Sequence, residues 1–302
     1  MKDSRSSEKV IGLTLGDAAG IGPEVIRAAL ASGQLDSEFS YRIIGEPPEC
    51  SLGEPTPETA RAAFAALGDA ARFALSGEIA AVVTGPIHKA RMQAVGFPFP
   101  GQTEFFAARC EVKNFAMLLT GGALTVALVT AHVPLRSVPE ILCVEEIVRV
   151  GNLLAEFLAL RNGNFPAQIA VAGLNPHAGE SGALGREEIE VIAPAVERLN
   201  RAQSPYLGRA IFSGPISPDT VFHRAASGEF GAVLCMYHDQ GLIPLKLHAF
   251  DEGVNVTLGL PIVRTSPDHG TAFEIAGKGL ARPDSMIAAI NLAAELAKKR
   301  SA

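Results

Sequence analysis

The sequence predicts an α/β fold built around a largely parallel β-sheet. Apolar runs of strand length alternate with longer segments of helical periodicity, and this alternation is typical of helices that cover a parallel sheet. The chain has 302 residues, which suggests two domains or one large one. Hydrophobic residues make up 48% of the chain and charged residues 19%, which is enough apolar content to bury a core and too little charge for a disordered protein.

The first half of the chain supplies the alternation in a simple order. We expect a strand over 10–15, a helix over 23–31, a strand over 41–44, a helix over 57–76 and a strand over 79–83. Pro57 stands in the first turn of the second helix, where its missing N–H costs nothing. The segment 47–57 contains four prolines and little periodicity, so we expect a flexible connection there.

The second half continues the pattern after a hairpin. Two apolar runs around Met117 and Val126 are separated by two glycines, which is typical of antiparallel strands joined by a turn. The periodicity then predicts helices over 144–160, 186–200, 219–226 and 284–299, and strands over 168–173, 210–213 and 232–236. Glu187 and Glu188 in the first turn of the helix over 186–200 complement its dipole.

Charge and cysteine content exclude several classes of protein. With 26 Lys+Arg and 32 Asp+Glu, the net charge is −6, so the chain has no general basic field for nucleic acid. The four cysteines lack metal-clip spacing, and we expect buried thiols in a reducing compartment. Residues 1–9 have no apolar signal core, and the apolar run 115–133 is broken by glycines and threonines. We therefore expect a cytoplasmic protein without a membrane partner.

Three histidines stand where predicted strands end. His132, His177 and His238 each follow an apolar run directly. In open α/β sheets the carboxyl ends of strands face the binding crevice, so these imidazoles are expected to converge there. Three neutral imidazoles and an open position suit a catalytic divalent metal ion. A lone histidine in a loop is more often an ordinary hydrogen-bonded residue. Because three histidines stand in equivalent places, the metal hypothesis and this ordinary role are about equally supported.

Other polar residues near the strand ends leave two interpretations open. Asp239 either orients a metal-bound histidine or accepts a proton from substrate, or it simply caps the next helix. The loop 16–24 is first of all a tight strand-to-helix turn, with ligand contact as the alternative, because it matches neither phosphate-binding glycine motif. Lys246 and Arg264 would suit an anionic substrate, and each is also a common surface charge.

At this point a set of motifs along nearly the whole chain resembles one family. They are GDAAGIGPE, VTGPIHK, VTAHVPL, GLNPHAGE, GPISPDTVF, MYHDQGLIPLK and VNVTLGLPIVRTSPDHGTAFEIAGKG. The chain resembles the 4-hydroxythreonine-4-phosphate dehydrogenases, NAD-dependent enzymes of pyridoxal phosphate biosynthesis. The resemblance implies an isocitrate/isopropylmalate dehydrogenase-like fold with two α/β/α domains and the active-site cleft between them. The implied domains are 1–112 with 248–302, and 113–247, which carries the dimer interface.

The resemblance also assigns roles to residues. It implies a homodimer in which His132, His177 and His238 bind one divalent ion (Zn, Mg or Co) shared between partners. The implied substrate-binding residues are Gln102, Thr103, Lys246, Asn255 and Arg264. NAD or NADP is expected at Asp268, His269, Gly270 and Thr271. The family oxidises 4-phosphohydroxy-L-threonine to a 3-keto acid, which loses carbon dioxide to give 3-amino-2-oxopropyl phosphate.

Two departures from the family keep other readings open. Gln102 stands where the family usually has histidine, and an amide can donate a hydrogen bond but cannot titrate. The chain is also shortened between Ile44 and Pro57. One alternative is therefore the same chemistry on a 4-phosphorylated threonate or erythronate. A second alternative is a non-catalytic homologue that senses metal and phosphate.

Overall fold

The computed structural model describes residues 9–162, 167–207 and 211–301, and the chain divides into two units. The first unit comprises Met1–Lys113 and Leu260–Ala302, and the second comprises Asn114–Gly259. The chain therefore returns to the first unit at Leu260 and not at residue 248 as predicted. The reason is strand β9 (Val254–Leu258), which pairs antiparallel with β4 (Ala116–Gly121) and so belongs to the second unit.

A parallel sheet forms the centre of the first unit. Its strand order is β2-β1-β3-β10. The strands are β1 (Val10–Thr14), β2 (Ser40–Ile44), β3 (Ala81–Thr84) and β10 (Val263–Pro267). Ile11 and Leu13 of β1 are fully buried, as expected for a strand covered on both faces. Because the strands are parallel, their carboxyl ends all lie at one edge of this sheet.

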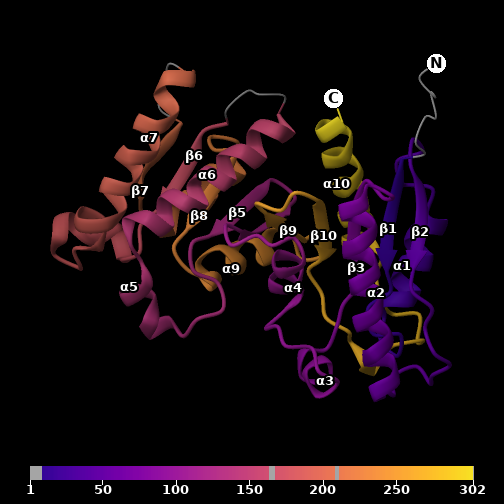
Figure 1. The fold of residues 1–302 in the computed structure, drawn as a ribbon. Helices are drawn as coiled ribbons and strands as arrows, with labels where there is room; N and C mark the ends of the chain where they lie inside the picture. Colours follow the sequence, from indigo (N-terminus) through magenta and orange to yellow (C-terminus); the bar gives the residue numbers. More distant parts are fainter. Residues whose placement is uncertain (1–8, 163–166, 208–210, 302) are drawn as a thin grey trace, which may run out of the picture. The chain divides into compact units, whose positions relative to one another are not determined.

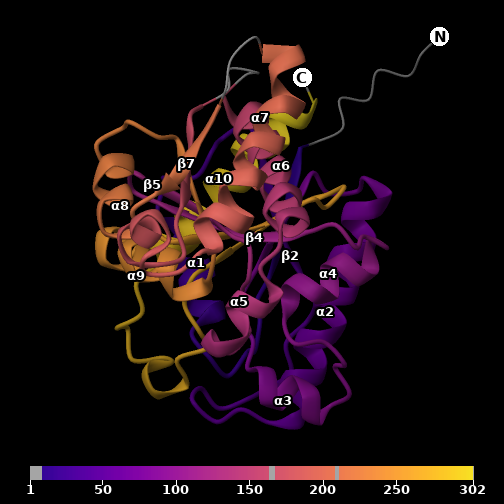
Figure 2. The same ribbon diagram turned by 90° about the vertical axis from the view of Figure 1, so that its left-hand side faces the viewer.

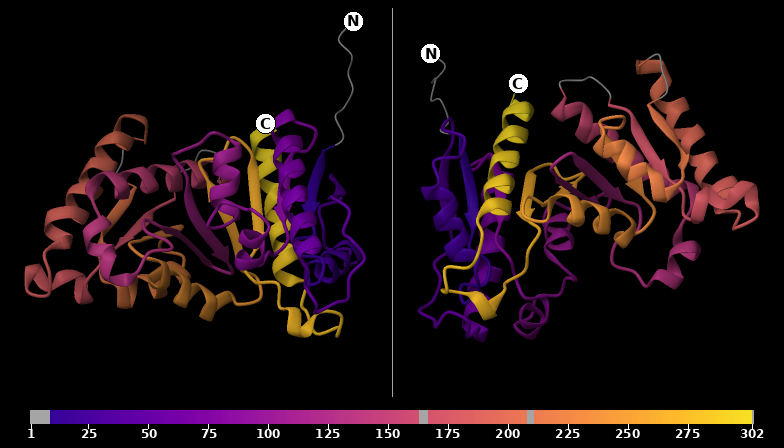
Figure 3. Two further views of the ribbon diagram at one scale, coloured as in Figure 1. Left: turned by 60° about the horizontal axis from the view of Figure 1, so that its bottom comes forward. Right: turned by 180° about the vertical axis from the view of Figure 1, so that it is seen from behind.

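Helices cover both faces of the first sheet (Figures 1 and 3). Helix α2 packs on one face of β1 and β3, whereas α1 and α10 pack against each other on the other face. The helices of this unit are α1 (Gly22–Ala31), α2 (Pro57–Ser76), α3 (Lys89–Ala94), α4 (Gln102–Arg109) and α10 (Asp284–Ser301), with a short 3₁₀ turn at Phe273–Ile275. Helix α2 has the predicted bounds because Thr56 caps its start and Gly77, at φ 78°, ends it.

The sheet of the second unit is mixed. Its strand order is β9-β4-β5-β8-β6-β7. The remaining strands are β5 (Leu124–Leu128), β6 (Ile169–Ala172), β7 (Phe212–Ile216) and β8 (Ala232–Cys235). β4 and β5 form the predicted hairpin, whereas β5, β8, β6 and β7 run parallel. The strand predicted over 210–213 begins at Phe212, and residue 210 lies outside the described residues.

The second unit is also layered. Helices α6 and α7 pack together, and α8 and α9 pack against β5 and β8 on the other side (Figure 2). Their bounds are α6 (Val144–Arg161), α7 (Ala193–Leu207), α8 (Pro218–Ala226) and α9 (His238–Ala249), with short turns at Leu135–Ser137 and Val138–Ile141 (α5). The helix predicted over 186–200 in fact opens with a π-helical turn, Glu188–Ile192. Helix α9 escapes the sequence pattern because it contains Gly241 and Pro244, both poor helix formers.

Two sequence expectations concern the environment of the chain. In the part of the chain that the structure describes, no helix is long and apolar enough to cross a membrane. All four cysteines are free, but only Cys235 is buried. The prediction of four buried thiols is therefore wrong for Cys50, Cys110 and Cys143, which are half-buried because they lie outside the packed strands.

Candidate active site

The three predicted histidines follow three neighbouring parallel strands of the second unit. His132 follows β5, His238 begins α9 just after β8, and His177 follows β6, and the strand order at this place is β5-β8-β6. The carboxyl ends of these strands lie at one edge of the sheet. All three histidines therefore follow strands at one edge of the sheet, as the strand-end pattern predicted.

Two of these histidines are in contact. The ring centroids of His132 and His238 are 5.6 Å apart, with the planes tilted by 42°. The rings open on a pocket of about 450 Å³ whose wall includes Leu135, Val138 and Tyr237. Asp239, also in the wall, places its Oδ1 2.7 Å from His238 Nδ1. A carboxylate at this distance favours the tautomer that carries its proton on Nδ1, and in that tautomer Nε2 is a potential metal ligand.

The backbone N–H and C=O of one residue, Met236, link the loops that carry the histidines. The carbonyl of Met236 accepts hydrogen bonds from the backbone N–H and the hydroxyl of Thr130, at 3.2 and 2.8 Å. The N–H of Met236 donates to Gln240 Oε1 at 2.7 Å, and Gln240 Nε2 donates to the Gly173 carbonyl at 2.7 Å. Gln240 is buried, so it makes a rigid tie between the end of β8 and the end of β6. Sequence reasoning missed Thr130 and Gln240, although both stand in the quoted motifs.

His177 stands apart from the other two histidines in this chain. Its side chain is 60% exposed, and its Nδ1 lies 3.7 Å from Asp219 Oδ2. Among the described residues, no group of three His, Cys, Asp or Glu side chains is close enough to hold a metal ion. One chain therefore brings together His132 and His238 but not His177.

The first unit carries a buried cationic group. Arg264 of β10 is 3% exposed, and its Nη2 donates to Thr84 Oγ1 at 2.7 Å and to Gln102 Oε1 at 3.0 Å. Gln102 Nε2 in turn donates to the Gly85 carbonyl at 3.0 Å. Burial lowers the pKa of Arg264 to about 10, so the guanidinium stays charged at neutral pH. Thr103, the neighbour of Gln102 in the first turn of α4, is buried as well. Sequence reasoning missed Thr84, which directly follows the strand predicted over 79–83 and is the last residue of β3.

Two predicted substrate residues lie in the second unit. Lys246 is half-buried on α9, and Asn255 is half-buried on β9 opposite Leu119 of β4. The Oδ1 atom of Asn255 is buried and has no hydrogen-bond partner among the described residues. An unsatisfied buried acceptor is costly, so this oxygen marks a place where a ligand donor fits.

The predicted cofactor segment is held by the loop 16–24. Ile21 donates its N–H to the Thr271 carbonyl at 2.9 Å, and Glu24 accepts from the Gly277 N–H at 2.9 Å. A Cβ on Gly20 would stand 2.6 Å from the Thr271 carbonyl oxygen, so the glycine permits this close approach. The first interpretation of loop 16–24, a tight turn, is thus what the structure shows, and the turn also supports the cofactor segment.

The segment itself offers room and a free ring nitrogen. A Cβ on Gly270 would meet no atom within 4 Å. His269 Nε2 is buried and has no hydrogen-bond partner among the described residues. Burial lowers the pKa of His269, so its ring is neutral near neutral pH. Asp268 is anchored through its N–H to Ser285 Oγ at 3.1 Å. The segment thus has a buried ring nitrogen without a hydrogen-bond partner among the described residues and open space at Gly270.

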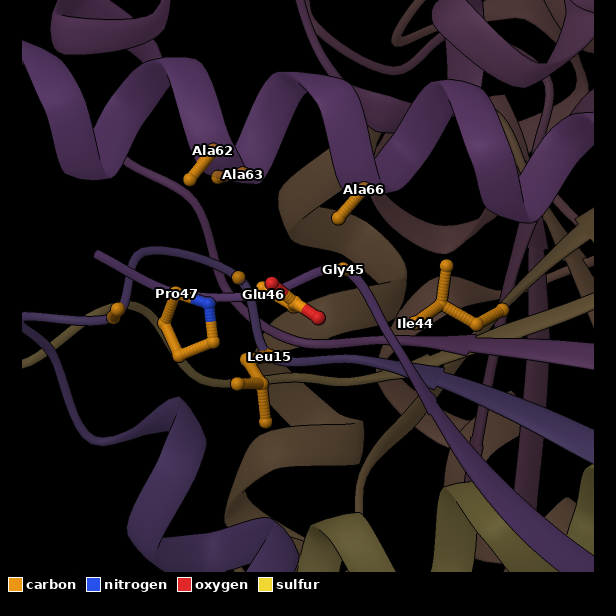
Figure 4. A pocket seen from close by; sticks show the side chains of 10 residues that line it. Leu15, Ile44, Gly45, Glu46, Pro47, Ala62, Ala63 and Ala66 are labelled. Atoms are coloured by element: carbon orange, nitrogen blue, oxygen red, sulfur yellow. The ribbon is translucent and has the colours of Figure 1, made fainter.

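A small hollow lies at the start of the segment that follows β2 in the first unit. Its wall consists of the ends of β1 and β2 and three alanines of α2, Ala62, Ala63 and Ala66 (Figure 4). Glu46 is its one ionisable lining residue, and it is exposed to solvent. The segment 47–57, which follows the hollow, is attached to the rest of the unit, because Gly53 donates its N–H to the Ala19 carbonyl at 2.7 Å. The prediction of a flexible connection over 47–57 thus overlooked this anchor on the 16–24 loop.

Comparison with known proteins bears on these features together. The family model "Pyridoxal phosphate biosynthetic protein PdxA" matches residues 23–293. A 4-hydroxythreonine-4-phosphate dehydrogenase of Desulfosudis oleivorans is 43% identical, with 95% of this chain and 96% of that protein covered. The crystal structure of a 4-hydroxythreonine-4-phosphate dehydrogenase from Klebsiella pneumoniae superposes with a TM-score of 0.80 at 36% identity, covering 96% of this chain and 100% of that one.

A more distant likeness concerns the fold alone. A β-decarboxylating dehydrogenase of Thermococcus kodakarensis has a TM-score of 0.50 at 17% identity, covering 94% of this chain and 81% of that one. The predicted α/β fold of the isocitrate/isopropylmalate dehydrogenase type is confirmed. Given the match over most of its length and the identity to these relatives, the chain belongs to the PdxA family of pyridoxal phosphate biosynthetic proteins.

Proposed function

We propose that this chain catalyses the metal-dependent, NAD(P)-linked oxidation of 4-phosphohydroxy-L-threonine. The product is a 3-keto acid, which loses carbon dioxide to give 3-amino-2-oxopropyl phosphate. The relatives named for this substrate support the assignment. The observation that carries it is the contact between His132 and His238 at the edge of a pocket, with Asp239 on the Nδ1 side of His238.

The residues present fit a divalent ion in part. His132 and His238 supply two imidazoles from one chain, and Asp239 supports one of them from behind. We assign the third imidazole to His177 of the partner subunit, because His177 of the same chain is held near Asp219 instead. A bound ion of the Zn, Mg or Co type would lower the pKa of the substrate hydroxyl and polarise the carbonyl that forms. Of the three roles considered for Asp239, its contact with His238 supports the orienting role.

The cofactor and the anionic groups of the substrate are assigned to other residues. We place NAD or NADP against Asp268, His269, Gly270 and Thr271, where the bound cofactor would supply the acceptor for the hydride of the alcohol carbon. Arg264 carries a buried positive charge suited to a carboxylate or phosphate. The other substrate contacts in the proposal are Gln102, Thr103, Lys246 and Asn255. The unsatisfied Asn255 oxygen would accept a hydrogen bond from an amino or hydroxyl group.

The exposed face of α9 supports the homodimer. Ile243, Leu247 and Phe250 are 65%, 88% and 76% exposed, and their spacing of three and four residues puts them on one face of the chain at and just past α9. An apolar row of this kind is costly in water and is typical of a subunit interface. Because α9 begins with His238, a second copy bound here would come close to the histidine pair. A cytoplasmic location is part of the same proposal, since all four thiols are free.

The test follows NAD(P)H formation with a panel of phosphorylated hydroxy acids. We expect turnover of 4-phosphohydroxy-L-threonine that stops after chelator treatment and returns when a divalent ion is added. Turnover of a 4-phosphorylated threonate or erythronate alone would favour the alternative substrate, to which the position of Gln102 against Arg264 is relevant. Binding of metal and phosphate without any turnover would contradict the enzyme assignment.

A further inference from the structure

The loop that carries His177 has an unusual backbone. Five consecutive residues, 177–181, have positive φ angles between 45° and 80° and form a left-handed turn. Four of them carry side chains, and only Gly179 is a glycine. Residues with a Cβ disfavour this region, so four of them within five positions need strong support from their surroundings. Within the turn, Leu184 donates its N–H to the Gly179 carbonyl at 3.1 Å and Ala183 to the Glu180 carbonyl at 3.2 Å.

One buried carboxylate occupies the inside of this loop. Glu188 is 2% exposed, and its Oε1 accepts hydrogen bonds from the backbone N–H groups of Leu174 and Asn175, both at 2.7 Å. Its Oε2 accepts from Asn175 Nδ2 at 3.0 Å. Backbone N–H groups that bind a carboxylate make charge-assisted hydrogen bonds, which are stronger than neutral ones. Glu188 therefore fixes the two residues that precede Pro176 and His177.

The same carboxylate also sets the shape of the turn itself. A Cβ on Gly179 would stand 2.6 Å from Glu188 Oε2, and a Cβ on Gly173 would stand 3.2 Å from Glu188 Oε1. The chain thus wraps closely around the carboxylate at both ends of the loop. Glu188 itself is held in place because it begins the π-helical turn whose last residue, Ile192, is fully buried.

We propose that Glu188 is the positioning residue for His177: its carboxylate holds the left-handed turn and thereby sets where the imidazole stands. The inference rests on the proposed function in one respect only, the role of His177 as a metal ligand. Residues that orient a ligand from behind commonly change metal affinity 10- to 100-fold when replaced. Glu188 would act in this way through the backbone and not through the ring.

The test compares Glu188→Ala with Glu190→Ala in the full-length protein. Glu190 carries the same charge in the same helical turn but pairs with the exposed Arg186. In the metal-free protein we expect hydrogen exchange at the amides of 178, 183 and 184 to speed up more than about 10-fold in Glu188→Ala only. Dissociation constants for Zn²⁺ and Co²⁺ should rise about 10- to 100-fold in the same variant.

Further variants separate positioning from a general structural role. Glu188→Gln keeps one carbonyl acceptor for the two backbone N–H groups, so it should restore much of the metal affinity. In a His177→Ala background, Glu188→Ala should have no additional effect on affinity, because His177 is the group through which it acts. If Glu188→Ala does not fold, Gly179→Ala tests the same turn, since its Cβ would press on the Glu188 carboxylate.

The outcomes are distinct. Unchanged exchange at the three amides, or an equal loss of affinity with and without His177, would overturn the role of Glu188. A native protein that binds no divalent ion would instead contradict the proposed function, and the exchange measurement would still decide whether Glu188 holds the turn.

Discussion

The histidine region of the second unit and the arginine region of the first unit are built in opposite ways. His132 and His238 lie in the wall of an open pocket, whereas Arg264 is 3% exposed and fixed by Thr84 and Gln102. In the arginine region, Nη2 of Arg264 already donates two hydrogen bonds within one chain. The histidine region brings two imidazoles together and leaves the third, His177, 60% exposed beside Asp219.

This difference shows that a single chain can position its arginine fully and still leave its histidine site one ligand short. A buried guanidinium must be held by its own chain, because an unpaired buried charge destabilises the fold. Imidazoles at the wall of an open pocket carry no such cost, so one chain can present them without a metal ion or a third ligand. The predictions that follow test whether the two regions differ in this way, from the largest expected effect to the smallest.

The largest effect is expected from His132→Ala. It removes one of the two adjoining imidazoles, so kcat/KM should fall more than about 100-fold, beyond the usual effect of residues behind the ligands. Thermal unfolding should barely change, because the ring lies at a pocket wall. His223→Ala, an exposed histidine on α8, is the matched control. Equal activity of both variants would contradict the metal assignment.

A smaller effect is expected from Asp239→Asn. The amide keeps the shape of the side chain but loses the charge that holds His238 Nδ1–H at 2.7 Å. Metal affinity, measured by competition with a chelating indicator, should fall about 10- to 100-fold. If the affinity stays unchanged while kcat alone falls, Asp239 acts on the substrate proton and not on the ring.

A still smaller effect is expected from Gln102→His in the arginine region. Position 102 accepts a hydrogen bond from Arg264, and a neutral imidazole can do the same, whereas a protonated one can only donate. We expect kcat/KM within about tenfold of the native value at pH 8 and a relative loss below about pH 6.5, where the ring becomes charged. A gain above about tenfold at low pH that vanishes as the ring deprotonates would mean that this position binds an anion directly.

The smallest effect is expected at an ion pair that belongs to neither region. The hydrogen bond from Lys298 lowers the pKa of Asp36, whose Oδ2 lies 2.7 Å from Lys298 Nζ. A carboxyl with a lowered folded pKa stabilises the protein above its unfolded pKa, and this contribution is lost as the pH falls through the folded pKa. Asp36→Asn should therefore cost less than about 1 kcal/mol at pH 7 and nothing in strong acid, as measured by urea unfolding. A larger loss of stability, or one that does not change with pH, would contradict the assignment of a lowered pKa to Asp36.

The sequence predicted the framework better than the contacts of the site. The helix over 57–76 and the hairpin around Met117 and Val126 were predicted from local signals, namely Pro57 in the first turn of the helix and two glycines between the strands. The strand-end rule also placed the three histidines on one edge. Helix α9 could not be predicted from periodicity, because packing on β5 outweighs the poor propensity of Gly241 and Pro244.

The tertiary contacts of the site were beyond sequence reasoning for a different reason. Gln240 and Glu188 act through backbone groups that are 67 and 13 to 14 residues away, and no local pattern indicates such partners. The separation of His177 from His132 and His238 is likewise a property of the folded chain. Motif resemblance could name the three histidines but could not show which of them one chain brings together.

The shared histidine site is tested most directly by complementation between two inactive variants. His132→Ala and His177→Ala are each purified, mixed, dissociated and allowed to reassociate. If His177 of the partner subunit completes the site, each mixed dimer contains one intact site, and activity should return to about a quarter of the native value for random pairing. If all three histidines act within one chain, each site keeps a defect in every combination, and a mixture that stays inactive would contradict the shared site.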